Sequence, residues 1–92
     1  MLLYIYKEIK YNVIGENMNN NDINSIIANN IYKYRILQHI SIKKLSELTK
    51  IPLTVLNDIE SNTINREVTI DEIYKISIIL KTPVNKLLEN ND

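Results

Sequence analysis

The stretch of residues 41–61 constrains the fold most, because it contains two short amphipathic segments with almost no chain between them. Ser41 is suited to cap a first helix that runs to Lys50, and Pro52 stands where the first turn of a second helix tolerates a proline. Apolar residues recur at helical spacing, at Ile42, Leu45 and Leu48 in the first segment and at Val55, Leu56 and Ile59 in the second. The sequence therefore predicts two short helices joined by a tight turn.

Three further segments carry the same helical period. Steps of three and four residues predict a helix from Ile23 to about Gln38, whose apolar face consists of Ile23, Ile26, Ile27, Ile31, Tyr34 and either Ile36 or Leu37. Thr69 and Glu72 form a capping box that predicts a helix to Leu80, and Thr82-Pro83 begins a last short helix with Val84, Leu87 and Leu88 on its inner side. With one glycine and two prolines in 92 residues, we expect one all-α domain of five helices over residues 22–90.

Residues 1–21 are expected to lie outside this domain, as an N-terminal arm and an asparagine-rich linker. The apolar stretch 2–14 fits neither the helical nor the strand period, so an extra strand, a dimer arm and disorder all stay open. A mistaken start is a further alternative for residues 1–17, since Gly15-Glu16 can be encoded by a ribosome-binding sequence shortly before Met18.

Composition excludes several classes of function. The chain has no cysteine and a single histidine, His39, so neither a disulfide framework nor a histidine- or cysteine-based metal site is expected. We find no membrane span, signal peptide, glycine-rich phosphate loop or nucleophile with a base, which predicts a cytoplasmic protein that is not an enzyme and has no cofactor or small-molecule substrate. The formal net charge of zero removes the basic field that nucleic-acid binders commonly have.

The two central segments meet the requirements of a helix-turn-helix, in which a small residue must stand where the helices cross. Leu45 is the inner anchor, Ser46 the small residue and Ile51 the plug of the turn. Over residues 26–88 the chain resembles the lambda-repressor/Cro-type (xenobiotic-response-element) helix-turn-helix family. Residues 41–46 match the opening of its second helix, 50–52 the turn, 56–60 the end of its third helix and 69–80 the next helix.

The resemblance implies a five-helix lambda-repressor-like fold and a partner, double-stranded DNA. In that family the third helix enters the major groove, which implies base contacts from Leu53, Thr54, Asn57 and Asp58. The start of the second helix and the loop after the third touch phosphates, which implies Lys43, Lys44, Asn62 and Thr63. The implied function is a transcriptional regulator, with repression as the expected mode, acting as a homodimer through the last helix with the C-terminal tail or through the N-terminal arm.

Three positions depart from the family pattern. Ile42 stands where a glutamine commonly contacts the DNA backbone, and Lys50 replaces a glycine in the turn, where a positive φ costs about 1 kcal/mol. Asp58 brings negative charge toward the groove, where its use would be to accept from cytosine N4. These departures, with the neutral charge, support an alternative function: a protein-interaction module that keeps the fold and has lost DNA binding.

Some charged and aromatic residues allow two interpretations. Glu60 either pairs with Arg35 or is an exposed carboxylate, and Arg66 either reaches DNA or caps the acidic helix start at Asp71 and Glu72, the second being preferred. A similar choice applies to Lys33 and Arg35, which fit a solvated helix face better than a phosphate cluster, and to Tyr32 and Tyr34, which fit the core and its rim better than a stacking surface.

Overall fold

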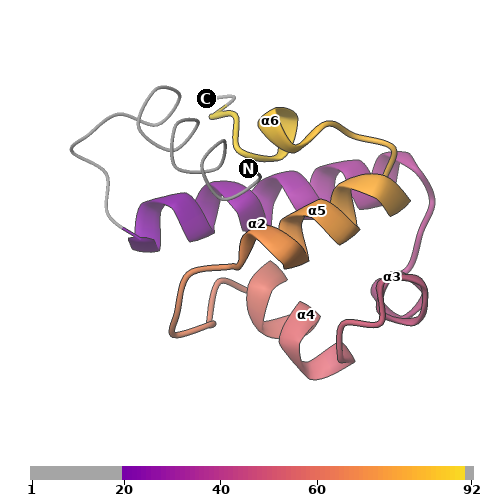
Figure 1. Ribbon diagram of the computed structural model, residues 1–92, viewed down its shortest axis with the longest axis horizontal. Helices are drawn as coiled ribbons and strands as arrows, with labels where there is room; N and C mark the ends of the chain where they lie inside the picture. Colours follow the sequence, from indigo (N-terminus) through magenta and orange to yellow (C-terminus); the bar gives the residue numbers. More distant parts are fainter. Residues whose placement is uncertain (1–19, 91–92) are drawn as a thin grey trace.

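The computed structural model describes residues 20–90, which are all helical or loop and contain no strand. Five helices follow in order: α2 (Asn20–Leu37), α3 (Ile42–Thr49), α4 (Leu53–Glu60), α5 (Ile70–Ile79) and α6 (Val84–Leu87). In Figure 1, α3 and α4 lie below the long helices α2 and α5, and α6 lies above them. The predicted all-α, five-helix architecture is confirmed, whereas the expectations for residues 1–19 fall outside the described part of the chain.

The helix boundaries follow from the capping residues. Ser41 is extended and its Oγ accepts from the Lys44 backbone N–H at 3.0 Å, as predicted. Thr69 and Glu72 exchange both hydrogen bonds of the predicted capping box, at 2.9 and 3.1 Å. The two prolines, in contrast, lie one residue earlier than expected: Pro52 and Pro83 occupy the N-cap with ψ of 142° and 149°, outside the first helical turn.

The core lies between α2, α5 and the helix-turn-helix. It consists of Ile23, Ile27, Ile31, Leu45, Ile51, Leu56, Ile59, Val68, Ile73, Ile76, Leu80, Leu87 and Leu88. In α2 the buried series recurs every fourth residue, so the next inner position belongs to Arg35 and the following residues turn outward. The expectation that Ile36 or Leu37 faces the core is therefore wrong, since they are 47% and 62% exposed.

Leu48 is a second correction. It was expected on the inner face of α3, but it is 46% exposed, and the position one residue later, Thr49, is buried instead. A helix of eight residues presents a narrow inner stripe, and Leu45 with Thr49, four residues apart, fills it.

Two buried asparagines tie α2 to the parts of the chain that follow the helix-turn-helix. Asn24 donates to the Arg66 carbonyl at 2.8 Å and accepts from the Val68 N–H at 3.3 Å. Asn30 donates to the carbonyls of Leu87 and Glu89 at 2.8 and 2.9 Å. Because buried polar groups are costly unless hydrogen-bonded, these contacts fix the loop after α4 and the end of α6 against α2.

Candidate functional site

The turn between α3 and α4 is held by local hydrogen bonds. Lys50 adopts the left-handed conformation at φ 66°, as the motif required, and its N–H donates to the Ser46 carbonyl at 2.9 Å. Ser46 Oγ donates to the Ile51 carbonyl at 2.6 Å, and the Ile51 N–H donates to Thr49 Oγ1 at 3.2 Å. Ile51 is buried, and these hydrogen bonds with its burial fix the turn between α3 and α4.

The start of α3 exposes positive charge. Lys43 and Lys44 are exposed in the first turn, which has no acidic residue, and the helix dipole places partial positive charge at the same end. The ammonium of Lys44 lies 3.9 Å from the Glu47 carboxylate, but both side chains are more than half exposed, so this pair is weak.

The outer face of α4 is exposed to solvent. Leu56 and Ile59 are buried on one side of the helix. On the other side Thr54, Asn57 and Asp58 are exposed, and Leu53 is 37% exposed. A helix with one anchored side and one exposed side of mixed polar and apolar residues is the form in which helices present side chains to a groove.

The end of α4 is braced by Asp58. Thr63 donates from its backbone N–H to the Asp58 carbonyl at 2.8 Å and from its hydroxyl to Asp58 Oδ1 at 3.2 Å. Ser61 Oγ donates to the Asn57 carbonyl at 2.7 Å and lies 2.8 Å from the Thr63 hydroxyl, while Asn62 takes the left-handed conformation at φ 60°. The carboxylate of Asp58 therefore orders the loop as well as facing solvent, a role that the sequence analysis did not foresee.

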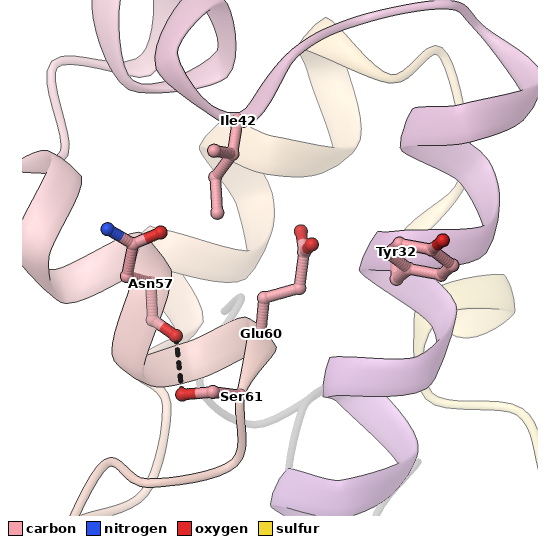
Figure 2. A pocket seen from close by; sticks show the side chains of 5 residues that line it. All are labelled: Tyr32, Ile42, Asn57, Glu60 and Ser61. Carbon is pink, nitrogen blue, oxygen red and sulfur yellow. Dashed lines mark hydrogen bonds between the residues drawn. The ribbon is translucent and has the colours of Figure 1, made fainter.

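A shallow, open hollow of about 280 Å³ lies where α2, α3 and α4 meet. It is lined by Tyr32, Ile42, Asn57, Glu60 and Ser61 (Figure 2). Figure 2 shows Ile42 pointing down into the hollow, with Asn57 on one side and Glu60 and Tyr32 on the other. Because its walls come from three helices, no sequence period predicts it.

The Arg35–Glu60 pair lies at the border of this hollow and settles the two interpretations of Glu60 in favour of the ion pair. Arg35 Nε donates to Glu60 Oε2 at 2.9 Å and Nη2 donates to Oε1 at 2.7 Å, and the two side chains are only 12% and 13% exposed. A third bond runs from Nη1 to the Ile40 carbonyl at 3.0 Å. The hydrogen bonds to Glu60 raise the pKa of Arg35 although burial opposes this, so the guanidinium stays charged and links α2 to the end of α4.

The preferred interpretation of Arg66, that it caps the acidic start of α5, is confirmed in part. Its guanidinium binds Glu72 through two bonds of 3.0 and 2.8 Å, whereas Asp71 pairs with Lys75 at 3.1 Å. Burial alone would raise the pKa of Glu72, but the hydrogen bonds from Arg66 and from the Thr69 backbone outweigh it and hold that pKa below its ordinary value. Arg66 thus stabilises the start of α5.

The predicted site residues are all exposed, and the structure brings some of them into contact. Lys43 and Lys44 lie at the start of α3, the four α4 residues on its outer side, and Asn62 and Thr63 in the following loop. Asp58 and Thr63 contact each other, and Asn57 shares the hollow with Ile42, but neither lysine lines that hollow. Tyr32 was not predicted as part of the site. Its aromatic side chain allowed a stacking surface as an interpretation, but the core and its rim were preferred.

Within residues 20–90, none of the helices combines the length and the apolar character that a membrane span needs. No group of three or more histidine, aspartate or glutamate side chains in residues 20–90 is placed to hold a metal ion.

A helix-turn-helix domain is defined by this arrangement: α3 is capped and carries lysines, the turn is hydrogen-bonded, and α4 is exposed on its outer face. The helix-turn-helix family model matches residues 31–87, more than half of the chain, and the protein belongs to that family, of the lambda-repressor (xenobiotic-response-element) type, whose members are DNA-binding transcriptional regulators. Comparison with curated proteins and with solved structures gave no match.

Proposed function

We propose that the protein is a sequence-specific binder of double-stranded DNA that acts as a transcriptional repressor. The observation that carries this proposal is the exposed outer face of α4 beside the lysine-bearing start of α3. A promoter occupied at the major groove is closed to other proteins by steric exclusion, which requires no catalytic group. The proposed place of action is the cytoplasm.

Base recognition is assigned to α4. Asn57 has the amide that pairs with adenine through two hydrogen bonds, Thr54 offers a hydroxyl, and Leu53 has the apolar surface that suits a thymine methyl group. Asp58 is engaged by Thr63 through Oδ1, so any acceptance from cytosine N4 falls to Oδ2. Each good base contact is worth about 1–3 kcal/mol of discrimination.

Phosphate contacts are assigned to Lys43 and Lys44 and, through neutral groups, to Asn62 and Thr63. The Thr63 hydroxyl donates to Asp58 Oδ1 in the free protein, so it would have to turn from Asp58 to reach a phosphate. Since each lysine–phosphate contact changes the slope of log K against log salt by about 0.9, two lysines predict a slope near −2 per protomer. This is a small slope for a DNA-binding domain, as the balanced charge of the chain would lead one to expect.

A homodimer on a two-fold site, with half-sites about 34 Å apart, is the proposed active form. Leu87 and Leu88 are buried within the protomer, so a dimer through α6 would rest on its exposed residues Asn85 and Lys86 and on Pro83 at its N-cap. The alternative use of an N-terminal arm concerns residues outside the described part of the chain.

The second candidate function is a protein-interaction module with the same fold. Exposed apolar side chains on α2 and α5, namely Ile36, Leu37, Tyr74 and Ile78, are the observation that favours it. Under this alternative the protein folds and binds a protein partner but no DNA.

An electrophoretic mobility shift on the DNA upstream of the protein's own gene separates the two functions. We expect a shift that weakens between about 50 and about 200 mM salt and is lost in the Lys43→Ala, Asn57→Ala double variant. The matched control is Lys75→Ala, Asn29→Ala, which removes the same two groups from exposed positions outside the proposed surface. No shift at the lower salt from protein that is folded by circular dichroism would contradict DNA binding and favour the interaction module.

A further inference from the structure

Tyr32 is an aromatic side chain that the core does not use. It is 54% exposed on α2, and its ring lines the hollow at the junction with α3 and α4. Among residues 20–90 its hydroxyl has no hydrogen-bond partner. A large, half-exposed ring with a free donor, adjoining a surface already assigned to a ligand, is available for contact with that ligand.

The Tyr32 ring contacts the Arg35 side chain of the ion pair. The Arg35 guanidinium carbon lies 5.5 Å from the centroid of the Tyr32 ring, and Arg35 is itself fixed by Glu60 and the Ile40 carbonyl. The contact is a cation–π interaction, which favours one orientation of the ring. An exposed contact of this kind is worth about 0.5–1 kcal/mol, so it biases the ring toward the orientation in which it lies against Arg35.

The ion pair also changes what the hollow can accept. Glu60 lines it, and an unpaired carboxylate there would repel an anion. Both of its oxygens accept from Arg35, whose raised pKa keeps it charged, so the pair is neutral overall. The hollow is thus open to a phosphate oxygen.

The walls of the hollow match the chemistry of a nucleic-acid backbone. Ile42 and the Tyr32 ring supply apolar surface, and Tyr32 also carries a hydroxyl that can donate a hydrogen bond. A DNA strand alternates apolar faces of deoxyribose with anionic phosphates, and hydrogen bonds from neutral side chains, tyrosine among them, commonly reach those phosphates. Ile42 precedes Lys43 directly, so the hollow adjoins the surface assigned to phosphate contacts.

We propose that Tyr32 is a DNA-contacting residue, whose ring packs against a deoxyribose and whose hydroxyl donates to a backbone phosphate of the strand that crosses the start of α3. This inference rests on the proposed DNA binding and extends the interface to α2. The contact carries no sequence information, because it reaches only the backbone. The Tyr32 hydroxyl supplies a hydrogen-bond donor near the start of α3, where the side chain of Ile42 has no donor.

The salt dependence of binding distinguishes this contact from a lysine contact. A lysine that neutralises a phosphate releases counterions, so its removal flattens the slope of log K against log salt by about 0.9. A neutral hydroxyl releases none. Its loss lowers the affinity by the same factor at every salt concentration, about tenfold for a hydrogen bond to a charged group.

The test uses a labelled duplex of mixed sequence, since a backbone contact needs no operator, and measures binding by fluorescence anisotropy over a range of salt. Tyr32→Phe, which keeps the ring on Arg35, is compared with Tyr74→Phe, an exposed tyrosine of α5 that does not line the hollow, and with Lys43→Ala. We expect Tyr32→Phe to bind about tenfold more weakly with an unchanged slope and an unchanged melting temperature. Tyr74→Phe should match wild type, and Lys43→Ala should flatten the slope.

Three outcomes would overturn the inference. Equal binding by Tyr32→Phe and Tyr74→Phe would remove Tyr32 from the interface and leave DNA binding itself standing. A loss accompanied by a flatter slope would show that lysine contacts had moved, which contradicts a lost hydroxyl contact. Absence of binding by folded wild-type protein at low salt would remove the proposed function together with the role of Tyr32.

Discussion

Replacement of Arg35 by methionine is expected to destabilise the domain strongly. The variant removes the two bonds to Glu60 and the bond to the Ile40 carbonyl, and leaves a carboxylate that is only 13% exposed without its cation. Removing one partner of a buried pair costs about 3–5 kcal/mol. Glu60 borders the open hollow, where water can reach it, so we expect a value near the lower end, about 3 kcal/mol.

This estimate translates into a measurable shift. For a domain of this size 1 kcal/mol corresponds to about 4–8 °C in melting temperature, so Arg35→Met should melt roughly 12–24 °C lower. Urea unfolding followed by circular dichroism gives the free energy directly, provided that the m-value stays constant.

A double-mutant cycle tests whether the charge pair itself is the cause. Arg35→Met and Glu60→Met each leave one charge behind, whereas the double variant leaves none and replaces the pair by apolar groups. We expect the double variant to lie within about 1 kcal/mol of wild type, since apolar replacement of a whole buried pair is often neutral. Additive losses, with a coupling free energy near zero, would refute the reasoning, because they would mean that the two side chains contribute through separate contacts.

Three further perturbations have defined outcomes. Glu72→Gln should lower stability by about 1–2 kcal/mol at neutral pH. Because the folded-state pKa of Glu72 lies below 4.5, this contribution to stability is present above pH 4.5 and is lost as the pH falls. The urea midpoints of variant and wild type should therefore converge in acid, and a difference that does not change with pH would contradict this. Lys50→Gly removes the strain of a lysine in the left-handed conformation and should raise stability by about 0.5–1 kcal/mol. Asn62 has a similar φ, but asparagine tolerates it, so Asn62→Gly should change the melting temperature little. Equal effects of the two variants would argue against strain at Lys50. Asn30→Ala should cost about 1–3 kcal/mol by leaving carbonyls of the α6 region without their donor, and the exposed neighbour variant Asn29→Ala should cost almost nothing in the same melts.

The helices and the central motif were predictable because their signals are local. Ser41 with the Lys44 N–H, and Thr69 with Glu72, are pairs three residues apart, and the buried positions of α2 recur every fourth residue. Such patterns are contained in one stretch of chain. The same locality explains the left-handed Lys50, since a tight turn between two helices forces that conformation on whichever residue ends the first.

The parts that were missed depend on contacts between distant residues. Asn24 and Asn30 act on residues 42 to 59 positions away, and the hollow needs walls from three helices. The exposure of Leu48 and Leu37 was missed because helical spacing marks two adjacent faces, and only the neighbouring helices decide which one is covered. Tyr32 was assigned to the core or its rim for the same reason: composition does not tell a ring that packs inside from one that borders a surface hollow.

Because the chain is neutral, we expect the binding free energy of the proposed complex to come less from lysine–phosphate contacts than from contacts that release no counterions. Attraction that is independent of sequence grows with the number of lysine–phosphate contacts, and the proposed surface has two such lysines per protomer. Contacts from Asn57, Thr54 and Leu53 to base edges, and from Tyr32 to the backbone, release no counterions and so keep their strength as salt rises. Binding to arbitrary DNA should therefore fall with salt while discrimination between sequences persists. Since each protomer alone would then bind weakly, we expect the proposed dimer to gain its operator affinity from two half-sites engaged together. A variant that prevents dimerisation should therefore lose specific binding far more than the same change would cost a protein with a basic surface.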